Sequence, residues 1–236
     1  MIFPIYLAIT AQEFTHFEDF PSTLCYMACH FSASGAGLSN LPISLPAESI
    51  LCIDDSTPIS DHDPDIIASQ INDLVRTHHP CGILLDFQRP DNPQTFDITK
   101  RIISSINCPV AVSHIYASEL TCPVFLPPLP YRLTVEEYLK PWANREIWME
   151  LGNDMEMAIL TEESFGTERI YGIPEKHLPL HDPALLCHYS INVKQDHIAL
   201  YFQRTKSDLE QIQQAARKLG VSKFIGLWQQ LQRFYS

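Results

Sequence analysis

Residues 81–90 read Cys-Gly-Ile-Leu-Leu-Asp-Phe-Gln-Arg-Pro, an uninterrupted apolar run that ends in polar side chains. Consecutive aliphatic residues, rather than alternating apolar and polar ones, are typical of a strand covered on both faces, as in parallel sheets. Asp86 and Gln88 are two residues apart, so in an extended strand their side chains point to the same side. The stretch therefore predicts a buried parallel strand whose carboxyl end presents a carboxylate and an amide together.

The composition limits the classes of partner. The chain has 236 residues, of which 45% are hydrophobic, enough to fill one α/β barrel or two small domains. Its net charge of −12 argues against nucleic-acid binding, because phosphate contacts need a surplus of lysine and arginine. Gln12 and Glu13 interrupt the first apolar segment, and no basic region precedes it, so we expect no membrane partner.

The seven cysteines are an odd number and lie mostly in apolar, strand-like segments, where cysteine acts as a small hydrophobic residue. This usage is typical of a reduced compartment. We therefore expect a cytoplasmic protein.

Helices and strands alternate around the central stretch. Asp63, with Pro64 at the first helical position, predicts the start of one helix, and Thr95 that of another. Capping-box spacings predict helix starts at Thr134 and Ser207, each followed three residues later by a glutamate. This rhythm is typical of a parallel sheet. Besides the central stretch, the predicted parallel strands are Phe3–Thr10, Leu24–Phe31, Ser49–Asp54, Pro109–His114, Cys122–Leu126, Arg145–Leu151 and Lys223–Trp228.

The pattern changes between the seventh and eighth of these strands. From about Asp154, the segments Met155–Thr161, Leu186–Val193 and His197–Gln203 resemble antiparallel strands, the last two joined by a short polar turn. We therefore predict that residues 1–236 form a single α/β domain, a (β/α)8 TIM barrel with a small antiparallel insertion at 154–204. Barrels of this kind place their chemistry at the carboxyl ends of the strands.

This layout resembles the chitinase-like glycoside hydrolases of family eighteen, and the central strand carries part of the family's motif. The motif reads Asp-Gly-x-Asp-x-Asp-x-Glu, and here Gly82 and Asp86 match its glycine and last aspartate. Cys81 and Leu84 replace the first two aspartates, and Gln88 replaces the catalytic glutamate. The family's Met-Tyr-Asp element on the sixth strand is not visible in this sequence.

The carboxyl-terminal part resembles the small bacterial spore-associated members of the same family. His197–Phe202 would be a strand, Ser207 would cap a helix that ends at Gly220, and Phe224–Trp228 would be the last strand. In those members a terminal tryptophan floors the sugar site, so the resemblance gives this role to Trp228. The family often holds the peptide bond after that tryptophan in the cis form.

The resemblance implies a function and also a defect. In the family, the glutamate protonates the glycosidic oxygen, while the aspartate at the position of Asp86 orients the N-acetyl group that attacks the anomeric carbon. A carboxamide cannot supply that proton, and losing a general acid costs about two to four orders of magnitude in rate. Asp86, Gln88 and Trp228 would then bind an N-acetyl-amino-sugar without cleaving it efficiently. We expect a carbohydrate ligand and no cofactor.

A different acid could replace the missing glutamate. Glu150 on the seventh predicted strand, or Asp54 or Asp55 on the third, could face Asp86 across the barrel mouth. Two carboxyl groups about 5–9.5 Å apart suit glycoside hydrolysis. Glu150 is the preferred candidate, with Asp54 and His114 as further substrate-binding residues. The alternatives are structural: Glu150 could pair with Arg145.

Structural roles are open for the two motif residues as well. Asp86 could pair with Arg89, and Trp228 could belong to the core. Outside the family resemblance, Gln88 carries no functional signal.

A second function class is a metal-dependent or other small-molecule hydrolase. His30, Asp54, Asp86 and His114 all fall near predicted strand ends and offer nitrogen and oxygen ligands. No His-x-His pair or tight ligand spacing supports such a centre. The sequence therefore favours the carbohydrate hypothesis, with no metal assigned.

Overall fold

The computed structural model describes residues 4–14, 23–58, 62–89, 93–170 and 178–235. Eight parallel strands form a closed ring, in which each strand pairs with its neighbour and the last strand pairs with the first. The protein is therefore a (β/α)8 TIM barrel, as the sequence predicts. The ring strands are β1 (Ile5–Ile9), β2 (Leu24–Phe31), β4 (Ile50–Asp54), β5 (Gly82–Asp86), β6 (Val110–Ser113), β7 (Val124–Leu126), β8 (Ile147–Glu150) and β14 (Val221–Leu227).

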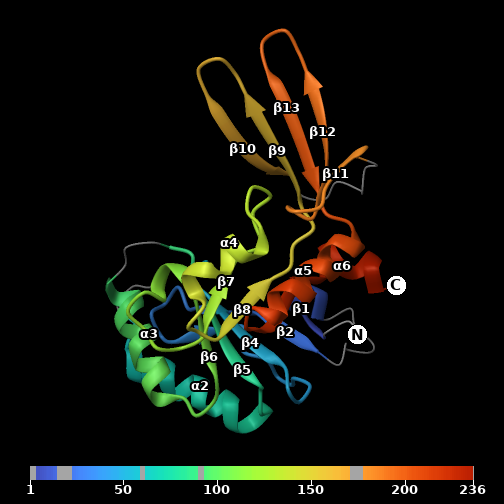
Figure 1. Cartoon of the computed structure of the whole chain (residues 1–236). Coiled ribbons are helices and arrows are strands. Elements are labelled where there is room, and N and C mark those ends of the chain that lie inside the picture. The colour runs from blue at the N-terminus through green and yellow to red at the C-terminus, as the bar shows by residue number, and fades with distance from the viewer. Residues whose placement is uncertain (1–3, 15–22, 59–61, 90–92, 171–177, 236) are drawn as a thin grey trace.

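The outer layer of helices is uneven. The long helices are α2 (Pro64–His78) and α3 (Pro93–Ser105), which cover one side of the barrel, and α5 (Lys206–Lys218) with α6 (Trp228–Tyr235) on another (Figure 1). After β2, residues 32–49 contain only the two-residue strand β3 (Leu38–Ser39) and no helix. The remaining helices are short: α1 (Ala11–Phe14), η1 (His114–Tyr116), α4 (Val135–Leu139) and η2 (Lys140–Trp142).

Two of the four predicted helix starts are confirmed, and a third, Thr95, is wrong because α3 already begins at Pro93. The Asp63 side chain accepts a hydrogen bond from the Asp65 N–H and caps α2, and Thr134 with Glu137 forms a complete capping box for α4. The predicted box of Ser207 and Glu210 is wrong. Helix α5 begins two residues earlier, because Thr205 is its N-cap and Asp208 supplies the reciprocal carboxylate.

The two-residue alternation of the strands separates two cores. Inward-facing residues fill the barrel interior, among them Leu84 on β5, Trp148 on β8 and Ile225 on β14. Residues of the opposite parity, such as Leu85 and Phe224, belong to the larger core between the barrel and its helices. Trp148 is fully buried, and its Cη2 would lie 2.5 Å from a Cβ at Gly82. The glycine at position 82 therefore makes room for the indole that fills the barrel.

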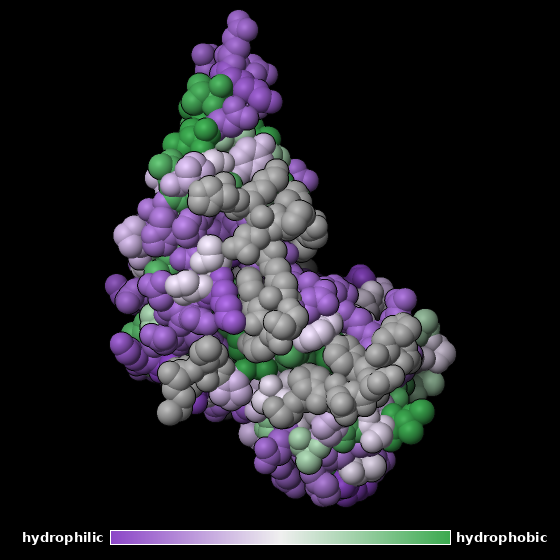
Figure 2. Space-filling view, turned by 90° about the vertical axis from the view of Figure 1, so that its right-hand side faces the viewer, coloured by the Kyte–Doolittle hydropathy of each residue, from purple (hydrophilic) through white to green (hydrophobic). Residues whose placement is uncertain are grey.

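The insertion between β8 and β14 is a separate five-stranded antiparallel sheet, here called the arm, with the strand order β10-β9-β13-β12-β11. It projects away from the barrel (Figure 1), and in the space-filling view it narrows toward a polar tip with an apolar patch just below it (Figure 2). Strands β10 and β11 are not predicted by the sequence. The arm strands are β9 (Met155–Leu160), β10 (Phe165–Ile170), β11 (Leu180–Asp182), β12 (Cys187–Val193) and β13 (Ile198–Gln203).

A buried arginine joins the arm to the barrel. Arg204, which follows β13 directly, donates hydrogen bonds to the carbonyls of Leu129 (2.5 Å) and Leu186 (3.3 Å). Its guanidinium also lies 4.2 Å from the centre of the Tyr131 ring, and that ring stacks on Phe202 of β13. The proline-rich loop after β7 is thus packed against the base of the arm.

Within the described ranges, no helix is both long and apolar enough to cross a membrane.

Candidate functional site

Polar side chains gather at the carboxyl ends of the barrel strands. Asp86 on β5, Ser113 on β6 and Glu150 on β8 each continue the inward-facing parity of their strand, two residues after Leu84, Ala111 and Trp148. Below them the barrel interior is apolar. The strand alternation therefore brings these three residues to one mouth, as the sequence predicts for Asp86 and Glu150.

Asp86 is held by two hydrogen bonds to one of its carboxylate oxygens. Ser113 Oγ donates to Oδ1 over 3.0 Å, and the Gln88 side-chain amide donates to the same atom. Burial raises the pKa of Asp86, and the nearby carboxylates of Asp54 and Asp55 raise it further, while the two hydrogen bonds act in the opposite direction. The second oxygen, Oδ2, is the atom of this carboxylate left to meet a ligand.

Glu150 has the most perturbed carboxyl group of the mouth. Burial, followed by the negative charge of Asp86, raises its pKa to about 7, although the positive charge of Arg169 lowers it. The negative charge of an ionised Asp86 opposes the ionisation of Glu150. A carboxyl group that holds its proton beside a second carboxylate is the arrangement from which a general acid can be assigned.

The arm and the last helix complete the polar set. Asp154, just after β8, accepts a hydrogen bond from Gln230 Nε2 of α6 over 2.9 Å, and burial raises its pKa. Gln230 also accepts the Asn153 N–H through Oε1 at 3.1 Å. Arg169 comes from β10 of the arm, and its charge lowers the pKa values of Glu150 and Asp154.

These residues line one cavity of about 310 Å³, here called the mouth cavity. Its volume is at the lower end of the range for small-ligand pockets, which suits one or two sugar rings. Apolar side chains of the barrel interior, including Phe125 and Leu227, form its floor and walls. The polar groups that line it are Asp86, Gln88, Glu150, Asp154, Arg169 and Gln230.

Three of these groups, Asp154, Arg169 and Gln230, are not predicted as site residues. Arg169 lies in the segment Phe165–Ile170, whose sequence Phe-Gly-Thr-Glu-Arg-Ile lacks the alternation of apolar residues that marks a strand. Its position follows from the pairing of Arg169 with Glu156 across β10 and β9. Only the three-dimensional register shows that this arginine returns to the barrel mouth.

Asp54 and His114 lie beside the mouth cavity but do not line it. Asp54 Oδ1 accepts the Ser56 N–H at 2.8 Å and so shapes the turn after β4. His114 begins η1 after β6, where burial lowers its pKa and the charge of Asp86 opposes that effect. Neither residue lines the cavity in which a substrate would bind. Asp54 shapes its own turn and raises the pKa of Asp86 through its charge, and His114 interacts with Asp86 electrostatically.

The structure places Trp228 outside the mouth cavity. It is partly buried and packs against the core between the barrel and its helices. Strand β14 ends at Leu227, so Trp228 is already the first residue of α6 rather than the tip of the strand. The expected cis bond after Trp228 is not found either, because the described peptide bonds are all trans.

The structural alternatives for the acids are not realised. Arg89 donates to the backbone carbonyls of Asp55 (2.8 Å) and Ser56 (2.7 Å) rather than to Asp86. The Asp55 carboxylate accepts the N–H groups of Gln88 and Arg89, both at 2.9 Å, so it fixes the loop after β5 and is not a second acid.

Arg145 does not pair with Glu150. It donates to the carbonyls of Ala117 and Cys122. Neither of the ion pairs considered from the sequence, Asp86 with Arg89 and Glu150 with Arg145, is therefore formed.

The metal centre considered from the sequence is not assembled. Among the residues with described placement, His30, Asp54, Asp86 and His114 do not bring three ligand atoms together, and the group that does so lies at the base of the arm. The larger open groove, of about 800 Å³, is formed by the two hairpin tips of the arm, around Glu163 and Asp196. It lies away from the ends of the barrel strands, and we assign the candidate site to the mouth cavity, where the pKa values of Asp86 and Glu150 are raised.

The fold is a (β/α)8 TIM barrel, and the carboxyl groups of Asp86, Glu150 and Asp154 line one cavity at its mouth. No family model and no curated protein matches the sequence, so the comparison rests on solved structures. The spore cortex-lytic enzyme SleL of Bacillus cereus superposes with a TM-score of 0.54 at 9% identity, over 87% of this chain and 63% of that one. The chain thus spans less than two thirds of that enzyme.

Two further structures give the same fold. SleL of Bacillus megaterium QM B1551 has a TM-score of 0.54 at 10% identity, over 95% of this chain and 69% of that chain. The Bacillus subtilis protein ydhD has a TM-score of 0.53 at 9% identity, over 86% of this chain and 90% of that chain. Its description as a sporulation-specific glycosylase is provisional. At these identities the likeness concerns the fold.

Proposed function

We propose that the protein binds a glycan containing an N-acetyl-amino-sugar in the mouth cavity and hydrolyses it slowly, with Glu150 as the proton donor. The observation that carries this proposal is that Glu150, whose pKa is raised to about 7 by burial and by the charge of Asp86, lines the same cavity as Asp86. A carboxyl group with a pKa of about 7 keeps a large share of its proton near neutral pH and can release it to a leaving group.

The roles follow from what each group can donate or accept. Asp86, with its Oδ1 held by Ser113 and Gln88, would orient the amide of the N-acetyl group through its other oxygen. That amide's carbonyl oxygen would attack the anomeric carbon, as in substrate-assisted glycoside hydrolysis. Glu150 would protonate the departing glycosidic oxygen, a role that the Gln88 carboxamide cannot fill. Arg169 would donate hydrogen bonds to sugar hydroxyls from the arm side.

The fold of the neighbours supports the same substrate class, because enzymes with this barrel include a spore cortex-lytic enzyme and a provisional glycosylase. The motif at Gly82 and Asp86 supports a chitinase-like, family-eighteen ancestry with the usual acid replaced at Gln88. The position of Glu150 in the same cavity, three strands away from Asp86 in the ring, supports a substitute acid.

A pH profile of hydrolysis tests the proposal. N-acetylglucosamine oligomers are incubated with the parent and with Glu150→Gln, and new reducing ends are counted between pH 5 and 9. We expect the parent rate to fall as the pH rises through about 7, and Glu150→Gln to lose about 10²-fold or more at pH 6. Exposed Glu136→Gln is the matched control. A Glu150→Gln variant that is as active as the parent contradicts the assignment.

A further inference from the structure

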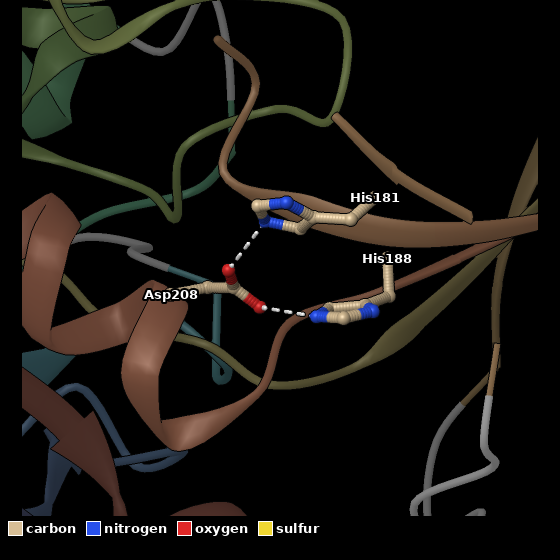
Figure 3. Close-up of side chains that lie close together, drawn as sticks. All are labelled: His181, His188 and Asp208. Atoms are coloured by element: carbon tan, nitrogen blue, oxygen red, sulfur yellow. Dashed lines mark hydrogen bonds and ion pairs between the residues drawn. The ribbon is translucent and has the colours of Figure 1, made fainter. Parts of the chain in front are cut away.

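Two histidines and a buried carboxylate meet at the base of the arm, away from the mouth cavity (Figure 3). His181 on β11 and His188 on β12 are directly opposite each other in the antiparallel register, so their side chains share one face. Asp208, in the first turn of α5, points its carboxylate between the two rings. The cluster therefore joins two arm strands to a helix of the barrel.

The spacing of the three side chains suits a metal ion. His181 Nε2 is 3.1 Å from Asp208 Oδ1, and His188 Nε2 is 3.7 Å from Oδ2. The imidazole centroids are 4.6 Å apart, and the three ligand atoms all lie within 4.8 Å of one another. Ligands of a tetrahedral zinc ion with bonds of about 2.0–2.1 Å are roughly 3.3 Å apart, so small side-chain adjustments suffice.

The carboxylate is oriented by its own helix. Asp208 Oδ2 accepts hydrogen bonds from the Thr205 N–H (2.8 Å) and from Thr205 Oγ1 (2.7 Å). The Asp208 side chain is only 2% exposed, whereas those of His181 and His188 are 38% and 33% exposed. A fixed inner carboxylate with two partly accessible imidazoles gives an ion a path from solvent, and the Thr205 contacts act as the outer hydrogen bonds that metal ligands require.

The two neighbouring charged side chains, Asp182 and Arg204, hydrogen-bond to backbone groups, and Arg204 also interacts electrostatically with Asp208. Asp182, next to His181, accepts the N–H groups of Ala184 (2.9 Å) and Leu185 (3.0 Å) and so stabilises a turn. Arg204 directs its guanidinium to backbone carbonyls and to the Tyr131 ring, as described above. Three protein ligands therefore face one point, and a fourth position stays open toward solvent.

We propose that His181, His188 and Asp208 form a binding site for a divalent transition-metal ion of the Zn²⁺ class. Two imidazole nitrogens and one carboxylate oxygen are ligands that this class accepts. The bound ion clamps β11 and β12 of the arm onto the amino-terminal turn of α5. Its binding stabilises the folded chain, because the unfolded chain does not hold the three ligands together.

The test is a titration of the chelator-treated full-length chain with Zn²⁺ by calorimetry, and with Co²⁺ by visible absorption. We expect one ion per chain, and a melting temperature that rises by about 5–10 °C with the ion in hundredfold excess over its Kd. His181→Asn and His188→Asn should each weaken Zn²⁺ binding by at least about 100-fold. Removing a residue that only hydrogen-bonds to a metal ligand costs about 10–100-fold in metal affinity, and removing a ligand itself should cost more. Both substitutions keep a polar side chain on an accessible position, so the fold should survive.

The matched control is His197→Asn. His197 lies on the same arm and its Nδ1 is 2.9 Å from Asp196, but that pair belongs to no three-ligand group within the described part of the chain. The control should bind Zn²⁺ like the parent. Absence of saturable Zn²⁺ and Co²⁺ binding by the parent would overturn the proposal. Equal weakening in His197→Asn and His188→Asn, which would indicate binding by scattered surface histidines, would do the same.

Discussion

The carboxylate of Asp86 raises the pKa of Glu150, and both residues line the same cavity at the mouth of the barrel. They come from β5 and β8, which β6 and β7 separate in the sheet. The curvature of the barrel, rather than local sequence, brings them to the same cavity. Burial and the charge of Asp86 together let Glu150 hold its proton up to about pH 7.

This relationship predicts a pH-dependent stability. Glu150 binds its proton more tightly in the folded state than in the unfolded chain, so its ionisation costs stability as the pH rises from about 4.5 to about 7. Glu150→Gln removes that cost, and we expect it to raise the free energy of unfolding at pH 8 by roughly 1–3 kcal/mol while changing it little at pH 4.5. Urea unfolding at the two pH values measures the difference. A variant that is destabilised equally at both pH values would contradict the raised pKa.

Trp228→Ala should separate stability from ligand binding. Because the partly buried indole packs against the core between the barrel and its helices, its removal should cost about 1–3 kcal/mol of the free energy of unfolding. The mouth cavity does not include Trp228, so affinity for N-acetylglucosamine oligomers should change less than about twofold, well under the tenfold that 1.4 kcal/mol represents. Unfolding curves and calorimetry on the same preparation give both values. Loss of sugar binding by a fully folded variant would restore the predicted tryptophan platform.

Gly82→Ala tests the packing of the barrel interior. The added methyl group would lie 2.5 Å from Trp148 Cη2 and 3.1 Å from the Pro109 carbonyl oxygen, so the indole must shift. Overpacking of this kind costs about 1–3 kcal/mol. In the double variant with Trp148→Phe, the smaller ring should recover part of that loss, giving a coupling energy that a thermodynamic cycle measures. Additive losses would show that the two side chains do not compete for the same space.

Gln88→Glu should add a proton donor beside Asp86. The Gln88 amide now donates to Asp86 Oδ1, and a glutamic acid could donate from the same place only while protonated. Two close carboxyl groups share a proton, so the pKa of one of them rises. We expect hydrolysis of N-acetylglucosamine oligomers to increase by about 10-fold or more over the parent, within the range for a restored general acid. Gln94→Glu, on exposed α3, is the control substitution.

The sequence predicts the barrel well, because the physical signals for it are local. Consecutive apolar residues mark the covered strands, and Asp63 and Thr134 mark helix starts. The strand ends also place Asp86 and Glu150 correctly, since each follows an inward-facing residue by two positions. These predictions need only the periodicity of a strand and the rule that barrel strands end at one mouth.

Long-range register decides the features that the sequence does not predict. Trp228 directly follows an apolar strand in the sequence, but in the structure it opens α6 and packs against the core between the barrel and its helices. Arg169 reaches the cavity through the pairing of β10 with β9, and its segment has no apolar alternation to reveal the strand. The opposition of His181 and His188 likewise depends on the register of β11 against β12. The capping box of α5 was ambiguous, because Thr205 with Asp208 and Ser207 with Glu210 have the same spacing.

The most direct measurement is calorimetric titration of the protein with short N-acetylglucosamine oligomers, with Asp86→Ala and the exposed control Asp73→Ala titrated in parallel. Asp86 lines the mouth cavity, whereas Asp73 lies on the solvent side of α2. The account predicts saturable binding by the parent and by Asp73→Ala, and a loss of at least about 10-fold in affinity for Asp86→Ala, the cost of removing one charge-assisted hydrogen bond. Absence of binding by the parent, or equal binding by a folded Asp86→Ala variant, would contradict a sugar site at the barrel mouth.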